Sequence, residues 1–473
     1  MRRLLRACVP PALLYAGLLA AGPAEPAKIA PLKFTDTRLA NGLRVIIAED
    51  HYAPLYSIAV TYNTGSRNER KGRTGFAHLF EHMMFKGSEK VGPGEHFFLV
   101  YNNGGNMNGS TSTDRTNYYE TLPKNQLDLG LFLESDRMRS LAITPENLDN
   151  QRATVQEERR QSVDNRPYGK TQELIDDLVY DNFAYKHSVI GSMEDLNAAS
   201  IQDVKDFFRT YYAPNNATLT LVGDLNTADA LARVQKYFGD IPRQQPPPPV
   251  DMTEPPQTQE RRTTLSDPLA RLPRLDMVFK GPFGNTPDAY ALSVLGTILG
   301  GAGGGGGGMR GGQGMGGENS SRLYQKLVKE KEAAVMVMAM FSQRRGPGTF
   351  RIVAVPRPGK SPEEVEALIT EEIARLQADP PTEKEMLRVR SGARRSAVQM
   401  REGSLFLAMR LGEYATFFDD PGLINTQLGK VLAVTPAAVQ SAAKTYLNPS
   451  QRTVVYTLPG AGGPRPRAPK PAQ

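Results

Sequence analysis

The stretch Thr210-Tyr211-Tyr212-Ala213-Pro214 leads into the strand-like run Ala217-Thr218-Leu219-Thr220-Leu221-Val222, and the same arrangement returns near the end of the sequence. The second copy is Thr445-Tyr446-Leu447-Asn448-Pro449, followed by Thr453-Val454-Val455-Tyr456-Thr457-Leu458. An expected helix with its own capping residue, Ser200 or Thr435, precedes each copy. Helix, turn and strand signals can match by chance, but two matched sets about one domain length apart favour duplication. We therefore expect two homologous halves.

A proline-rich stretch separates the two halves. Residues 242–262 contain Pro246-Pro247-Pro248-Pro249 among mainly polar residues, which favours an extended, semi-rigid linker. We expect an N-terminal domain at 33–241 and a C-terminal domain at 263–460. Both contain strand and helix patterns in alternation. The predicted fold class is therefore α+β, with two homologous α/β domains, each a mixed, mostly antiparallel sheet flanked by helices.

The expected elements rest on two kinds of pattern. Runs rich in β-branched and aromatic residues predict strands at 43–47, 56–62, 117–121, 275–280, 335–341 and 349–355. Capped periodic runs predict helices at 74–86, 125–142, 145–163, 287–299, 320–332, 361–377 and 382–400. Thr74 is expected to cap the first of these helices, and Thr144 followed by Pro145 to start the third.

The composition is that of a globular protein. The chain has 473 residues, of which 40% are hydrophobic and 23% charged, and this length suffices for two domains with their own cores. Most of the net charge of +7 comes from the two ends of the chain, through Arg2, Arg3, Arg6, Arg465, Arg467 and Lys470. The body between the ends is nearly neutral and has no basic patch, so nucleic acid is excluded as an expected partner.

The N-terminus has the pattern of an export signal. Basic residues precede an apolar stretch from about Ala7 to Ala21, and Gly22-Pro23-Ala24 offers small residues for cleavage. We expect residues 1–24 to be a signal peptide and the mature protein to be periplasmic, in a Gram-negative bacterium, with no stable membrane span. The alternative is an uncleaved anchor that leaves the protein membrane-associated. The shortness of the stretch and its two prolines disfavour this alternative.

Three further features limit the chemistry and the core. Cys8 is the only cysteine and lies in the leader, so the mature chain cannot form a disulfide, use a thiolate nucleophile or bind metal through cysteine. Residues 300–317 are mostly glycine and are expected to form a mobile loop. The proline-rich and basic tail at 461–473 is expected to be disordered.

His78-Leu79-Phe80-Glu81-His82 is the segment that indicates chemistry. Residues four apart lie on one face of a helix, so the two imidazoles can hold one metal ion with Glu81 beside them. Neutral imidazoles bind Zn²⁺, and a neighbouring carboxylate can accept a proton from the water that zinc activates. The order H-x-x-E-H is the inverted zincin motif. Such a short pattern also occurs by chance, and a helical histidine pair is often only a surface feature.

A catalytic zinc site needs a third protein ligand and an open position. Glu157 and Glu158 lie on the helix expected to begin at Pro145, whose apolar face is marked by Leu148 and Val155. Glu158 lies about one turn from Val155 and is the better inward-facing candidate. All five histidines are in the first half of the chain, so only that half offers a histidine zinc site.

Around this motif the chain resembles the pitrilysin/insulinase family of zinc metallopeptidases, in particular bacterial two-domain members similar to the subunits of mitochondrial processing peptidase. The matching segments are Asn41-Gly42-Leu43, Gly65-Ser66-Arg67, Gly75 to Gly87, Asn108-Gly109, Thr111, Asp114, Thr116-Asn117-Tyr118-Tyr119, Glu158 and Ser320-Ser321-Arg322-Leu323-Tyr324. In this family a glutamate 76 positions beyond the second histidine is the third ligand, which is Glu158 here. The resemblance implies one Zn²⁺ per chain, held by His78, His82 and Glu158.

The resemblance also implies an activity and a substrate site. Glu81 corresponds to the general base, and Asn108, with Thr111 nearby, to residues that bind the substrate backbone. In the family an edge strand at this place pairs with an extended peptide, which gives affinity with little sequence selectivity. A plain turn before a strand is the alternative reading of the Asn-Gly-rich residues 102–109. Family members usually have two related α/β domains per chain, and two such units enclose a chamber that admits short or unfolded peptides.

Some positions depart from the family pattern. Gln151 stands near the expected metal site where many members have a second glutamate, which weakens the negative field there. Lys329 and Met336 stand where self-sufficient members have an arginine and a tyrosine that stabilise the intermediate, and a methionine cannot donate a hydrogen bond. In some members these two residues come from a subunit without the zinc motif. We therefore expect a homodimer, or a heterodimer with a paralogue that lacks the motif.

The predicted function is that of a zinc-dependent endopeptidase acting on peptides or unfolded segments. The main alternative is a non-catalytic assembly subunit, like the family members of respiratory complexes, which have usually lost their metal residues. A peptide-binding chaperone with a structural zinc ion is a third reading. Structural zinc sites normally have four protein ligands, and the sequence offers no evident fourth.

Overall fold

The computed structural model describes residues 29–301 and 319–460 and contains two β-sheets, one from each half of the sequence. The expected signal peptide at 1–24, Cys8 and the tail at 461–473 lie outside the described residues, as does the glycine-rich stretch from 302 onward. No helix within the described ranges is long and apolar enough to cross a bilayer.

The first sheet has six strands in the spatial order β1-β2-β6-β3-β5-β4. Only β2 and β6 are parallel, and every other neighbouring pair is antiparallel. Its strands are β1 (Thr35–Arg38), β2 (Arg44–Glu49), β3 (Leu55–Tyr62), β4 (Asn106–Thr111), β5 (Thr116–Pro123) and β6 (Ala217–Gly223). Among the described residues β4 pairs with β5 only, and so it lies at an edge of the sheet.

The second sheet repeats this topology with five strands in the order β7-β11-β8-β10-β9. Its strands are β7 (Arg261–Asp267), β8 (Arg274–Phe283), β9 (Ala334–Ser342), β10 (Pro347–Pro356) and β11 (Arg452–Pro459). Taken in order, they correspond to β2, β6, β3, β5 and β4, and the one parallel pair, β7 with β11, stands in the equivalent place. The predicted fold class is thus confirmed.

The helices fall into two sets, one in each half of the sequence. The first set is α1 (Phe76–Met83), α2 (Glu95–Asn102), α3 (Leu127–Ser140), α4 (Pro145–Arg159), α5 (Gly169–Val179), α6 (Phe183–Lys186), α7 (Met193–Asn197), α8 (Ile201–Tyr211) and α9 (Thr227–Phe238). The second set is α10 (Pro287–Gly300), α11 (Pro362–Ala378), α12 (Glu383–Met400), α13 (Ser404–Phe418), α14 (Leu423–Leu432) and α15 (Pro436–Tyr446). Short 3₁₀ turns occur at η1 (Ser66–Asn68), η2 (Lys124–Gln126), η4 (Pro214–Asn216) and η6 (Pro449–Gln451), and π-helical turns at η3 (Arg160–Asp164) and η5 (Tyr324–Glu330).

Most helix starts follow the local sequence signals. Ser200 caps α8, Thr435 caps α15, and Thr144 caps α4 ahead of Pro145. The expected cap at Thr74 is wrong, because α1 begins one residue later and the residue before it is Gly75, in a left-handed conformation with φ 83°. Glycine adopts this conformation without steric cost.

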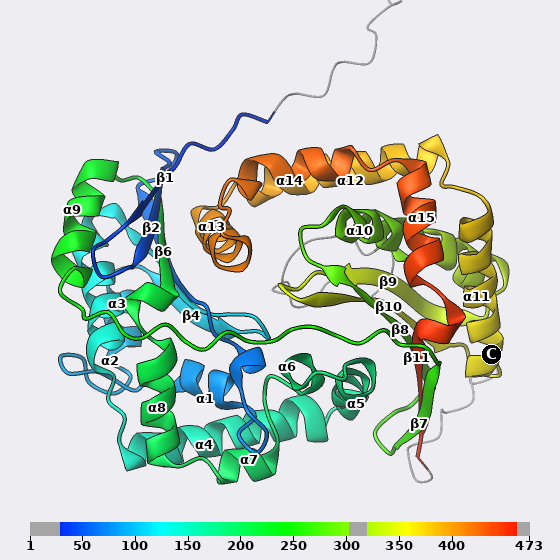
Figure 1. The fold of residues 1–473 in the computed structure, drawn as a ribbon, viewed down its shortest axis with the longest axis horizontal. Helices are drawn as coiled ribbons and strands as arrows, with labels where there is room; N and C mark the ends of the chain where they lie inside the picture. The colour runs from blue at the N-terminus through cyan, green and yellow to red at the C-terminus, as the bar shows by residue number, and fades with distance from the viewer. Residues whose placement is uncertain (1–28, 302–318, 461–473) are drawn as a thin grey trace, which may run out of the picture. The chain divides into compact units, whose positions relative to one another are not determined.

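Each sheet buries one face against its own helices and the other against a helix from the opposite half. In Figure 1, α1, α3 and α9 lie to one side of the first sheet and α13 to the other. Leu407 and Leu411 of α13 pack on Ile46 and Ala59 of the first sheet. Conversely, residues of α5 pack on Val278 and Val455 of the second sheet, through Ile175 and Val179. The domain limits 33–241 and 263–460 stay a prediction. The helices α13 and α5 each pack on the sheet of the other half, so the core of each sheet includes residues from both halves of the sequence.

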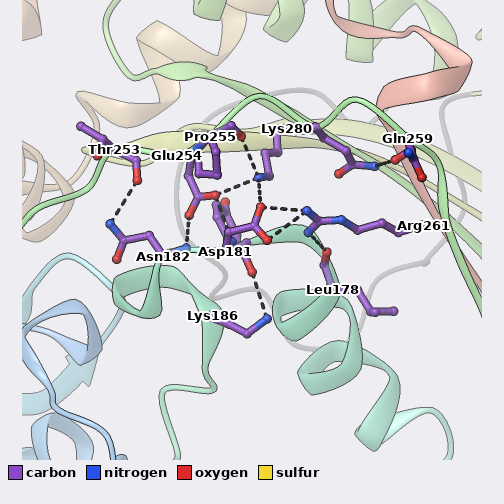
Figure 2. Close-up of polar contacts among 12 residues, drawn as sticks. Leu178, Asp181, Asn182, Lys186, Thr253, Glu254, Pro255, Gln259, Arg261 and Lys280 are labelled. Atoms are coloured by element: carbon purple, nitrogen blue, oxygen red, sulfur yellow. Dashed lines mark hydrogen bonds and ion pairs between the residues drawn. The ribbon is translucent and has the colours of Figure 1, made fainter.

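The linker is held to both halves by a polar network around the loop between α5 and α6 (Figure 2). The backbone N–H groups of Asp181 and Asn182 donate to the carboxylate of Glu254, at 3.0 and 2.9 Å. Lys280 of β8 donates to Asp181 at 2.9 Å and to Glu254 at 2.8 Å. Arg261, at the start of β7, also donates to Asp181. The first half, the linker and the second sheet thus share one set of ion pairs.

Candidate metal centre

The helix α1 places two imidazoles opposite its buried face. Phe76, Leu79, Phe80 and Met83 are buried in the core of the first half. His78 and His82 lie on one other face, with side chains 13% and 22% exposed and ring centroids 4.8 Å apart. The sequence spacing and the structure agree here, because the apolar residues fix which way the helix turns.

The helix α4 brings Glu158 to the two imidazoles. Its Oε2 atom lies 3.6 Å from Nε2 of His78 and 3.3 Å from Nε2 of His82. Leu148 and Val155 are buried and orient the helix. Glu157 points elsewhere and accepts hydrogen bonds from Arg160 and Gln161, both at 3.0 Å. The structure therefore brings Glu158, and not its neighbour, to the histidines.

The spacing of these donor atoms suits a small divalent cation. One ligand atom from each of His78, His82 and Glu158 lies within 4.8 Å of the others. A tetrahedral ion with bonds of about 2.1 Å separates its ligand atoms by about 3.4 Å, close to the two His–Glu distances. Burial lowers the pKa of His78 to about 4. The ring is therefore neutral at pH 7 and can offer a lone pair to a metal.

The rest of the surroundings leave one side of this group open. Nδ1 of His78 is buried without a hydrogen-bond partner, so packing rather than a hydrogen bond orients this ring. The side chain of Glu158 is 45% exposed. Within the part of the chain that the structure describes, no fourth His, Cys, Asp or Glu joins the three. Three protein donors with a free side is the ligand set of catalytic zinc sites and not of structural ones.

Glu81 belongs to α1, and its side chain lies against the edge strand β4. Burial raises the pKa of its carboxyl, and a hydrogen bond from the Thr111 hydroxyl opposes this rise. Gly109 of β4 leaves room for the carboxylate, because a Cβ there would lie 3.0 Å from Cγ and 3.2 Å from Oε1 of Glu81. The predicted base is thus half-buried beside the strand expected to hold substrate.

The structure brings only part of the other expected residues to the site. Thr111 is adjacent to Glu81, as described. Asn108 is exposed on β4, and its Oδ1 accepts from the N–H of Gly109 at 2.8 Å. Gln151 is buried on α4, where its amide donates to Asn150, and it makes no hydrogen bond to the three candidate ligands.

Lys329 and Met336, the two residues of the second half that depart from the family pattern, lie in η5 and in the strand β9 that follows it. Lys329 belongs to η5, where its ammonium lies 6.0 Å from the centroid of the Tyr324 ring. Met336 belongs to β9 and pairs with Val355 of β10. The roles of Lys329 and Met336 stay predictions.

Sequence reasoning missed a second buried group of possible ligands. His96, Glu120 and Glu134 each offer one ligand atom within 4.8 Å of the others, and all three are buried. Here, however, Arg137 donates to both carboxylate oxygens of Glu134. Its guanidinium already supplies the positive charge, and a second cation beside it would be repelled. The only local signal is the Glu–Arg spacing of three on α3.

Comparisons with known proteins match two family models to successive parts of the chain. Residues 44–192 match the family model described as Insulinase (Peptidase family M16), and residues 198–392 match the one described as Peptidase M16 inactive domain. All the candidate ligands fall in the first of these two regions.

Relatives and solved structures cover most of the chain. The zinc protease PqqE of Helicobacter pylori is 27% identical over 430 residues, which are 90% of this chain and 93% of that protein. A probable mitochondrial-processing peptidase subunit beta of Arabidopsis thaliana is 23% identical, over 87% of this chain and 76% of that protein. The crystal structure of a protease from Helicobacter pylori superposes with a TM-score of 0.84 at 26% identity, covering 91% of this chain and 100% of that one.

The buried Glu120 generates a prediction about stability. Burial raises the pKa of its carboxyl to about 7, so the unfolded chain loses this proton at lower pH than the folded chain. Ionisation therefore favours unfolding as the pH rises from about 4.5 to 7. Over this window the free energy of unfolding of wild type should fall relative to that of Glu120→Gln by about 3 kcal/mol. Urea unfolding at pH 4.5 and pH 8 measures the difference.

Glu157→Gln is the matched control for this measurement. Hydrogen bonds from Gln161 and Arg160 lower the pKa of the exposed Glu157 carboxyl, so its difference from wild type should stay constant between the two pH values. A Glu120→Gln difference that is equally constant would show that the buried carboxyl does not titrate in this range.

Proposed function

The chain belongs to the insulinase family of peptidases, M16, and we propose that it is an exported zinc-dependent endopeptidase that hydrolyses peptides or unfolded protein segments. The observation that carries the proposal is the set of three donors, His78, His82 and Glu158, with His–Glu distances of 3.6 and 3.3 Å and one open side. The relative PqqE, which matches this chain nearly end to end, is named a zinc protease.

The proposed mechanism assigns separate tasks to the residues around this centre. When bound by His78, His82 and Glu158, zinc supplies a Lewis acid that lowers the pKa of water and polarises a peptide carbonyl. Glu81 accepts the proton of the attacking water and later delivers it to the leaving amine. Its half-buried place beside β4 keeps the carboxylate between the ligand histidines and the edge strand.

The edge strand β4 is the proposed substrate site. In the part of the chain that the structure describes, its outer side has no neighbouring strand, so its backbone groups can pair with an extended peptide. Asn108 and Thr111 belong to this strand, and Thr111 also contacts Glu81. Recognition through main-chain groups favours extended or unfolded substrates and gives little selectivity for side chains.

A non-catalytic assembly subunit is the rival function. The description of the second family model as an inactive domain refers to residues 198–392, whereas the proposed metal and base residues lie before them. A scaffold has no need of three convergent donors with an open side. The rival therefore predicts a chain that binds no stoichiometric zinc.

Zinc binding separates Glu158 from its neighbour. Glu158→Gln should weaken zinc binding by more than about 100-fold, because even the loss of a residue behind a metal ligand commonly costs 10- to 100-fold. Glu157→Gln should bind zinc as wild type does, since that side chain points to Arg160 and Gln161. Equilibrium dialysis with elemental analysis measures both variants. Stoichiometric zinc in Glu158→Gln would rule out this ligand set.

Hydrolysis tests the base. Glu81→Gln should retain zinc but lose peptide cleavage by about 10²- to 10⁴-fold, because a carboxamide cannot accept the proton. Turnover of an unfolded protein substrate and of a peptide library, with zinc content measured on the same sample, gives the two readouts. Glu157→Gln serves again as the control. Undiminished cleavage by purified Glu81→Gln would falsify the assignment.

We also propose that a second chain completes the active site. Lys329 and Met336 do not supply the arginine and tyrosine expected of a self-sufficient enzyme, and one relative is named a subunit of a processing peptidase. The second chain is either another copy or a paralogue without the zinc motif. Adding the paralogue should raise the turnover of the purified chain, and light scattering should report a complex. The same turnover with and without paralogue, in a monomeric chain, would contradict the proposal.

A further inference from the structure

The first turn of α1 is capped by the side chain of Glu69, which comes six residues before Gly75 in the sequence. Gly75 has no side chain, and the usual capping bond is absent. Instead, Oε2 of Glu69 accepts from the N–H of Gly75 at 2.9 Å, and Oε1 accepts from that of Ala77 at 2.8 Å. These N–H groups would otherwise lack partners in the helix. Ala77 directly precedes the candidate ligand His78.

A buried imidazole lies beside this carboxyl group. The side chain of Glu69 is fully buried, and Nε2 of His187 lies 2.9 Å from its Oε2. The other ring nitrogen, Nδ1, faces the carbonyl of Phe183 at 2.8 Å, and the Phe183 ring stacks on the imidazole. Burial lowers the pKa of His187, but Glu69 more than offsets this and the net shift is upward. A carboxylate oxygen of Glu69 and the carbonyl oxygen of Phe183 lie within hydrogen-bond distance of the two ring nitrogens.

The chain that follows His187 connects α1 to the end of α4. Gly191 packs on Gly75 so closely that a Cβ at Gly191 would lie 2.5 Å from the Cα of Gly75. The carbonyl of Gly191 accepts from Nη1 of Arg159 at 2.6 Å. Arg159 is the residue after Glu158. One segment therefore contacts the start of the histidine helix and the residue next to the third ligand.

A second set of contacts runs in parallel with the first. Asp195 accepts from the N–H of Thr74 at 2.9 Å and from its hydroxyl at 2.5 Å. Further along, Arg152 of α4 donates to the carbonyls of Leu196 and Ala199, at 3.0 and 2.6 Å. Residues 187–199 thus form a brace that is bonded to Thr74, just before α1, and to Arg152 and Arg159 of α4.

We propose that Glu69 and His187 are positioning residues that set the zinc affinity of the site, by fixing α1 against the brace to which α4 is also bonded. The inference rests on the proposed zinc function. His78 and His82 move with α1, and Glu158 moves with α4, so the pair controls how closely the three donors are held together. Loss of either side chain loosens the first turn of α1 and weakens binding without removing any ligand.

Zinc affinity of the full chain, measured by competition with a chromogenic chelator, tests the proposal. His187→Gln removes the imidazole that faces Glu69, and Glu69→Gln leaves one acceptor where there were two. Each should weaken zinc binding by roughly tenfold, the lower end of the effect of residues that orient metal ligands. His51→Gln is the matched control, because His51 also pairs with a carboxylate, Asp224 at 2.7 Å, but is exposed and lies two residues after the end of β2. It should bind zinc as wild type does.

A second control separates positioning from general loss of stability. Asp276 is a buried carboxylate of the second sheet that accepts from Arg274 and Arg351. Asp276→Asn should lower the thermal midpoint without lowering zinc affinity at 20 °C. If Glu69→Gln does not fold, His187→Gln alone decides the outcome.

The possible failures are distinguishable. Wild-type affinity in folded His187→Gln overturns the positioning role and leaves the zinc function intact. An equal loss of affinity in Asp276→Asn also overturns it, since any destabilised variant would then behave in this way. Absence of zinc binding by wild type overturns the proposed function itself.

Discussion

The approach of α4 to α1 is the constraint on which the candidate centre depends. A helix of eight residues is too short to be stable alone, so the direction of its two imidazoles is set by what its other face buries. Phe80 illustrates this, since the centroid of its ring lies 4.5 Å from the ring centroid of Tyr212 and 5.5 Å from that of Phe207. The core of the first half therefore determines which residues of α1 remain on the outer side. Those residues include His78 and His82, two of the three candidate ligands.

Duplication explains why the same topology serves two different tasks. Between β8 and β9 the second half has the helix α10, in the interval where the first half has α1. Residues on every side of α10 are buried, including Leu292, Val294, Leu295 and Ile298. A helix that is apolar all round is a core element, and it has no face left for ligands. The second copy has thus kept the sheet order while its helix became part of the core.

The sequence was sufficient where a signal is local and insufficient where it is not. Spacing along one helix predicts His78, Glu81 and His82 as candidates, and helical phase favours Glu158 over Glu157. The structure places Glu158 beside the two histidines. Thr74 was assigned as a cap because a threonine before an apolar run is a strong local signal. In the structure its hydroxyl bonds to Asp195, and Glu69 takes the capping role. A contact between Glu69 and His187, so far apart in the sequence, leaves no periodic or motif signal.

Local sequence signals also do not predict that α13 packs on the first sheet and α5 on the second. The apolar residues of α13 predict a buried face but not the sheet that it covers, and Gly412 shows how specific that contact is. A Cβ at Gly412 would lie 2.6 Å from Oγ1 of Thr61 in β3, so only glycine lets the helix approach the first sheet this closely. From α13, Glu413 reaches Arg115 at 3.8 Å, and from the β9–β10 turn the N–H of Arg345 donates to Asp114 at 2.9 Å. Both contacts hold the turn that joins β4 to β5. A second half without candidate ligands therefore still fixes the hairpin beside Glu81, which gives a physical reason why the two copies are retained in one chain.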